Sequence, residues 1–155
     1  MSEVRRIDDQ LYRGFEGDTW HGPSLMDALN GVDAATAAAR PIPGAHSIWE
    51  LVLHLTVWLD IPKRRLEHMQ AIEATPEQDW PTVGDTSEEG WREALERLRQ
   101  AYQELRNLLA TLDEDRIEQT SPGRDYPVYV MIHGVMQHLA YHSGQIALLR
   151  KARSR

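Results

Sequence analysis

The chain has 155 residues, of which 26% are charged and 41% are hydrophobic, and its formal net charge is −7. This length and composition are typical of one soluble globular domain spanning residues 1–155. The negative charge argues against a broad nucleic-acid-binding surface, and no stretch approaches the roughly 20 apolar residues that a membrane span needs. The absence of cysteine excludes disulfides, thiolate metal sites and a cysteine nucleophile. Since the N-terminal residues also lack the apolar core of a signal peptide, we expect a cytoplasmic protein.

A first helix is expected over residues 3–15, because apolar residues recur there every four positions. They form a narrow stripe of Ile7, Leu11 and Phe15. Two shorter helices are expected to follow, at residues 24–30 and 34–39. Ser24 and Asp33 precede them and carry side chains that cap helix N-termini.

The second main helix is expected to begin at Ser47, with Glu50 at the position that completes a capping box. Its apolar positions are Ile48, Leu51, Val52, Leu55, Leu59 and Leu66. Pro62 lies inside this pattern, and we expect it to bend the helix without ending it, because the apolar period continues to Met69. Residues 74–87 are polar and rich in proline, and they predict a long crossover connection.

The third helix is expected over residues 87–112, with Ser87 as its cap. Its apolar stripe consists of Trp91, Leu95, Leu98, Tyr102, Leu105 and Leu109. A polar linker over residues 113–126 should lead to a fourth helix from Pro127 to about Ala152. Four long helices with longer connections predict an all-α fold, an antiparallel four-helix bundle with crossover connections.

Two histidines of the fourth helix carry the first functional signal. His138 and His142 are one helical turn apart, so their side chains share a face. The same face carries Met131, Val135, Ile146 and Leu149. Imidazole nitrogens inside an apolar stripe need partners, and one metal ion would satisfy a nitrogen on each ring. Two core histidines that hydrogen-bond to neighbouring helices would give the same pattern, and the spacing alone does not separate these hypotheses.

His54 supplies a third imidazole from the second helix. It lies at the edge of that helix's apolar face, between Leu51 and Trp58. Metal sites in helical bundles are built from side chains on facing helices. Three histidines with an open position are typical of catalytic rather than structural zinc sites. A half-buried surface histidine is the simpler alternative for His54.

The other histidines give weaker signals. His133 should face away from the pair at 138 and 142, and His46 is expected at the surface or as a cap. Leu139 stands where a zinc peptidase of the HExxH type carries its glutamate base, which excludes that activity. Gln145 lies one turn after His142 and is a candidate to hydrogen-bond that imidazole.

At residues 138–151, HLAYHSGQIALLRK, the sequence resembles the DinB/YfiT-like superfamily, a group of helical-bundle metalloproteins unrelated to the DNA polymerase called DinB. The resemblance extends to WHGPSL at residues 20–25 and to SIWELVLHLTVW at residues 47–58. It implies a four-helix bundle in which His54, His138 and His142 hold a divalent metal, zinc or nickel first, with iron, manganese or copper as alternatives. It also implies a homodimer.

The resemblance implies a reaction class as well, because the best understood relatives transfer low-molecular-weight thiols such as bacillithiol or mycothiol. We therefore expect a metal-dependent small-thiol S-transferase or a related hydrolase acting on a small molecule. A metal-bound thiol is deprotonated outright, and a metal-bound water has its pKa lowered to about 7. Two alternatives stay open: a non-catalytic, stress-related metal or small-molecule binding protein, and a bundle whose histidines are only structural.

Overall fold

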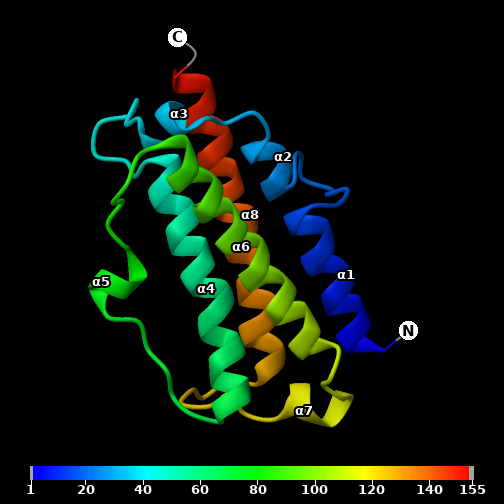
Figure 1. Cartoon of the computed structure of the whole chain (residues 1–155). Coiled ribbons are helices and arrows are strands. Elements are labelled where there is room, and N and C mark those ends of the chain that lie inside the picture. Colours follow the sequence, from blue (N-terminus) through cyan, green and yellow to red (C-terminus); the bar gives the residue numbers. More distant parts are fainter. Residues whose placement is uncertain (1, 154–155) are drawn as a thin grey trace.

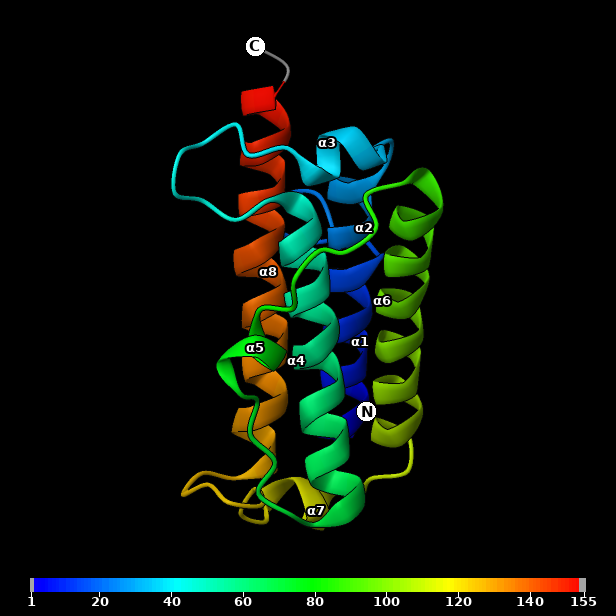
Figure 2. The ribbon, with the colours of Figure 1, turned by 60° about the vertical axis from the view of Figure 1, so that its left-hand side comes forward.

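A computed structural model describes residues 2–153, and four long helices lie side by side along its length (Figure 1). They are α1 (Glu3–Phe15), α4 (Ile48–His68), α6 (Glu88–Leu109) and α8 (Val128–Arg153). The chain runs up α1 and α8 and down α4 and α6 in the views of Figures 1 and 2. Over residues 2–153 there is no β-strand, only an isolated bridge between Thr120 and Pro127. The expected all-α helical bundle is confirmed.

The connections contain four short helices: α2 (Leu25–Leu29), α3 (Ala34–Ala38), α5 (Pro76–Asp79) and α7 (Glu114–Glu118). The segment between α4 and α6 returns along the whole bundle and carries α5 on the way (Figure 2). This is why consecutive long helices α4 and α6 run in the same direction. The crossover was expected, but the turns of helix inside residues 74–87 and 113–126 were not. The N-caps Thr75 and Asp113 start these turns.

Local sequence signals set the helix boundaries. Ser24 and Ser47 each form a complete capping box, the first with Asp27 and the second, as expected, with Glu50. Helix α4 continues through Pro62 and ends at His68, because Met69 adopts the left-handed conformation with φ of 54°. His54 is therefore carried by an uninterrupted helix.

The core runs between the long helices and does not depend on the histidines. Val4, Ile7, Leu11 and Phe15 are buried on α1, and Phe15 stacks on Tyr102 of α6 at 3.7 Å between ring centroids. Each fully buried large apolar side chain stabilises the fold by roughly 1.5–3 kcal/mol relative to an exposed one, and these contacts do not involve the histidines. Among the described helices, none has the length and apolarity that a membrane span requires.

Candidate metal centre

Three imidazoles from two helices meet between α4 and α8. Nε2 of His138 lies 2.9 Å from Nε2 of His54 and 2.9 Å from Nε2 of His142. His54 and His142 are buried and His138 is half-buried. One ring nitrogen from each residue lies within 4.8 Å of the other two, so the group could hold one metal ion. The structure thus brings together the three histidines that the sequence and the resemblance singled out.

The outer nitrogens of two of these rings are held by oxygen atoms. Nδ1 of His54 lies 2.8 Å from the backbone carbonyl oxygen of Asp79, and Nδ1 of His142 lies 2.6 Å from Oε1 of Gln145. Carbonyl oxygens only accept hydrogen bonds, so each Nδ1–H donates. In the neutral ring this leaves a lone pair on Nε2, directed at the centre of the group. Gln145 therefore has the place expected of it.

The three inner nitrogens cannot satisfy one another. His54 and His142, when neutral, each present a lone pair on Nε2. A neutral His138 has one ring proton, so its Nε2 can donate to at most one of these neighbours. At the other contact, the lone pair of the neighbour's Nε2 faces Nε2 of His138 at 2.9 Å without a hydrogen bond, in a mostly buried place. A cation among the three nitrogens removes this conflict, and imidazole donors suit zinc, nickel, copper and iron.

The electrostatics of the group favour neutral rings. Burial, and then the neighbouring His142 and His54, lower the pKa of His138 to about 4. Burial also lowers the pKa of His142, against the opposing effect of its hydrogen bond with Gln145. Neutral imidazole is the form that ligates a metal, so these two rings are ready to bind one at neutral pH.

The crossover covers the outer side of His54. The indole of Trp80 stacks on His54 with 3.9 Å between centroids, and it also stacks on His46 at 3.6 Å. Trp58 Nε1 donates to Oδ1 of Asp79 at 2.5 Å. Sequence reasoning missed Asp79 and Trp80, which lie in the segment expected to be a polar connection. The Thr75–Pro76 helix start was the signal that this segment is locally ordered.

A cavity of about 400 Å³ adjoins His138. It lies between α4 and α8 and is mostly apolar. Its walls are Trp58, Pro62, Arg65, Tyr126, Val130, Met131, Gly134, Val135 and His138. A small molecule in this cavity would have one end beside the three-histidine group.

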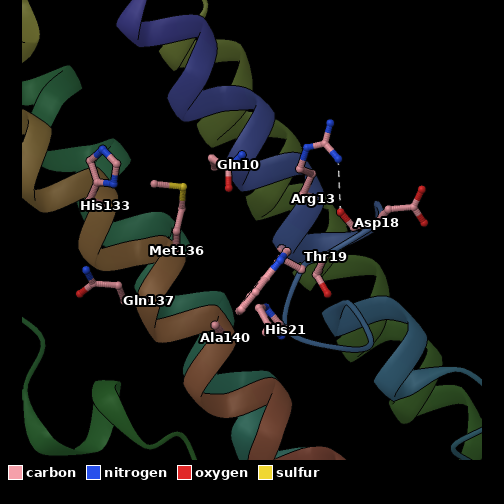
Figure 3. A pocket seen from close by; sticks show the side chains of 11 residues that line it. Gln10, Arg13, Asp18, Thr19, His21, His133, Met136, Gln137 and Ala140 are labelled. Atoms are coloured by element: carbon pink, nitrogen blue, oxygen red, sulfur yellow. Dashed lines mark hydrogen bonds between the residues drawn. The ribbon is translucent and has the colours of Figure 1, made fainter.

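A second, wider hollow of about 760 Å³ lies between α1 and α8 (Figure 3). It is lined by His21 and His133 but by none of the three clustered histidines. Nε2 of His133 is buried and has no hydrogen-bond partner within residues 2–153. His133 therefore faces away from the pair at 138 and 142, as expected. His21 likewise lines this second hollow and not the cavity beside the three-histidine group.

The sequence pattern of the DinB superfamily matches residues 19–146, which include all three clustered histidines. The chain belongs to the DinB superfamily. This match confirms the family suggested by the motif at residues 138–151.

A solved structure supports the fold of this DinB-superfamily chain. The crystal structure of a conserved protein from Enterococcus faecalis is similar, with a TM-score of 0.73 over 98% of this chain and 97% of the other. The sequences are 16% identical, so the likeness concerns the fold alone. None of the curated proteins matches the chain. The reaction must therefore be argued from the site of this DinB-superfamily member.

Proposed function

We propose that the chain is a metal-dependent enzyme in which His54, His138 and His142 hold one divalent cation, zinc or nickel. The observation that carries the proposal is the convergence of three Nε2 atoms while the outer nitrogens of His54 and His142 are bound to oxygens. Three protein ligands leave a coordination position for a water or a substrate, as catalytic zinc sites do.

The residues around the three histidines have different roles. Asp79 and Gln145 fix the ring orientation of His54 and His142 through their oxygens. Trp80 covers the ring of His54 and keeps water from that side. The indole N–H of Trp58 donates a hydrogen bond to Asp79 of the crossover, and the Trp58 side chain also lines the adjoining cavity. We place the small-molecule substrate in this cavity.

The residues around the cavity favour thiol transfer over hydrolysis. No Asp or Glu is among the residues that line the cavity, and Asp79 already accepts from Trp58 and contacts His54. Hydrolysis at a metal commonly uses a nearby carboxylate base, which this wall lacks. A divalent metal, when bound, deprotonates a thiol outright without such a base, whereas it lowers the pKa of bound water only to about 7. A small-thiol S-transferase, with a low-molecular-weight thiol as co-substrate, is therefore our first assignment.

Thiol consumption tests this assignment. Metal-loaded protein should consume at least one thiol from a panel of low-molecular-weight thiols in the presence of a chloro-aromatic electrophile. His142→Ala should be inactive, whereas His133→Ala, in the other hollow, should stay active. A loaded protein that binds a thiol tightly but never turns it over would instead be a binding protein.

We also propose that the chain forms a homodimer through the exposed face of α8. This face carries no charge from Val130 to Leu148, in a chain with a net charge of −7. Its exposed residues are Val130, Gly134, Gln137, Tyr141, Gly144 and Leu148. An uncharged face is where two equally charged copies meet with least repulsion, and Tyr141 and Leu148 are 65% and 58% exposed.

A further inference from the structure

Arg65 of α4 is a buried cation that the metal centre does not use. Its side chain is only 2% exposed. Nε donates to the carbonyl oxygen of Ile72 at 2.8 Å, and Nη2 donates to Oε2 of Glu73 at 3.3 Å. Nη1 faces Met131, whose sulfur lies 4.0 Å away and is a weak acceptor. The Tyr126 side chain also hydrogen-bonds this guanidinium, but Met131 is the weakest of the acceptors, so Nη1 is the donor that a ligand oxygen would best satisfy.

The charge around Arg65 is not balanced. Glu73 also accepts from Arg124, at 2.7 Å, and its side chain is 56% exposed. Two guanidinium groups therefore share one carboxylate, which leaves one positive charge in excess. Burial and then the charge of Arg124 lower the pKa of Arg65, against the opposing charge of Glu73. One monoanion would complete the balance.

Arg65 and His138 line the same cavity of about 400 Å³. The wall between them is apolar and includes Pro62, Val130 and Val135. Met131, which contacts Arg65, is seven residues before His138 on α8, a separation of about 10 Å along the helix. The cavity thus has a cationic end, an apolar middle and an end at the three-histidine group.

We propose that this cavity binds an elongated small molecule with a carboxylate that pairs with Arg65, an apolar body, and a reactive end beside His138. This inference rests on the proposed function, because the reacting end is placed by the metal centre. The planar guanidinium suits a carboxylate, which can accept two parallel N–H bonds. The Tyr126 side chain interacts with both Arg65 and Arg124 and lines the same wall, so it is a positioning residue for the charged end.

Calorimetric titration of the full chain with 4-phenylbutyrate and with its uncharged amide tests the inference. Each probe is titrated into zinc-saturated protein and into chelator-treated protein. We expect the carboxylate to bind at least tenfold more tightly than the amide in both states. Equal affinities in the wild-type protein would overturn the inference, and so would a preference present only with zinc, since the metal would then be the anion's partner.

Two pairs of variants locate the binding. Arg65→Met should abolish the preference for the carboxylate, and Arg65→Lys should keep part of it. Gly134→Leu should weaken binding of both probes at least tenfold, because Gly134 lines the cavity and a side chain there meets no atom within 4 Å of its Cβ. Gly144→Leu is the matched control, since this glycine is also exposed on α8 with open space but lies outside the cavity. A preference that survives in Arg65→Met, or binding unchanged in Gly134→Leu, would overturn the inference.

The titrations of chelator-treated protein do not depend on the metal proposal. A chain that prefers the carboxylate but retains no metal would support the anion site and contradict the metal enzyme. A chain that retains metal but binds both probes equally would support the metal site and contradict the anion site.

Discussion

His54 and Asp79 are 25 residues apart in the sequence, yet Nδ1 of His54 lies 2.8 Å from the backbone oxygen of Asp79 and 3.1 Å from its Oδ1. The crossover is thereby tied directly to an inner histidine of the three-histidine group. Because the oxygen atoms fix the Nδ1 proton, they also fix which nitrogen of His54 faces the centre. We therefore expect the conformation of the crossover to affect the affinity of the three-histidine group for a metal, and metal binding to affect the conformation of the crossover.

Asp79→Ala should weaken zinc affinity by about 10-fold, the lower end of the range for partners of metal-binding histidines. The backbone carbonyl remains in this variant, so binding should be reduced but not lost. Asp79→Asn keeps an oxygen at the same place, so its zinc affinity should lie between that of Asp79→Ala and that of the wild type. Glu77→Ala, in the same short helix but exposed, is the control. Competition with a coloured zinc chelator measures all four proteins, and an affinity of Asp79→Ala equal to that of Glu77→Ala would refute the role of the carboxylate.

Removal of the metal should lower the melting temperature without unfolding the bundle. A ligand bound only to the folded state at 100 times its Kd stabilises it by about 2.7 kcal/mol. For a chain of this size that corresponds to a shift on the order of 5–10 °C. Helical circular dichroism at 25 °C should persist after chelation, because the apolar core does not involve the ion. Complete unfolding on chelation would make the metal structural and would count against the catalytic assignment.

The metal-free protein should lose stability as the pH falls from about 6.5 toward about 4. The pKa of His138 is lowered to about 4 by burial, while the unfolded chain has the ordinary histidine value of about 6.5. Between these values the unfolded state binds more protons, so protons favour unfolding. Above about 6.5 this effect is absent. Urea unfolding midpoints measured in chelator across this range should decline toward low pH, and less steeply in His138→Gln. An equal decline in both proteins would assign the effect to other groups.

Leu148→Arg should convert a dimer into a monomer. Leu148 is 58% exposed on the uncharged face of α8, and a symmetric interface there would bring two added charges together. Gln100→Arg adds the same charge on the exposed face of α6 and should leave the dimer intact. Sedimentation equilibrium gives the mass of each protein. If the wild-type protein is a monomer, the homodimer proposal is wrong. If Leu148→Arg is still a dimer, the interface does not lie on this face of α8.

The long helices could be predicted because their signals are local. The capping boxes at Ser47 and Ser24 and the four-residue apolar periods mark where helices begin and which face is buried. The pair His138 and His142 is equally local, since the two residues are one turn apart. The spacing alone left the pairing of His54 with them open, and packing of α4 on α8 brings the three rings together.

The remaining site residues could not be predicted because tertiary contacts place them. Asp79 and Trp80 belong to a polar, proline-rich segment with no hydrophobic period, and only the path of the crossover along the bundle brings them to His54. Arg65 lies within a helix that the sequence predicted. Its burial, however, follows from the loop residues Ile72 and Glu73, which fold back over its side chain. Neither relationship leaves a pattern in the local sequence.

The most direct test of the metal centre is the metal content of protein purified without a histidine tag, measured by mass spectrometry. We predict about one divalent ion per chain in the wild-type protein. His138→Ala and His142→Ala should hold none, His54→Ala should lose most of it, and the control His133→Ala should keep it. A wild-type protein that holds no metal after exposure to zinc and nickel would contradict the account, as would loss of metal in His133→Ala with retention in His54→Ala.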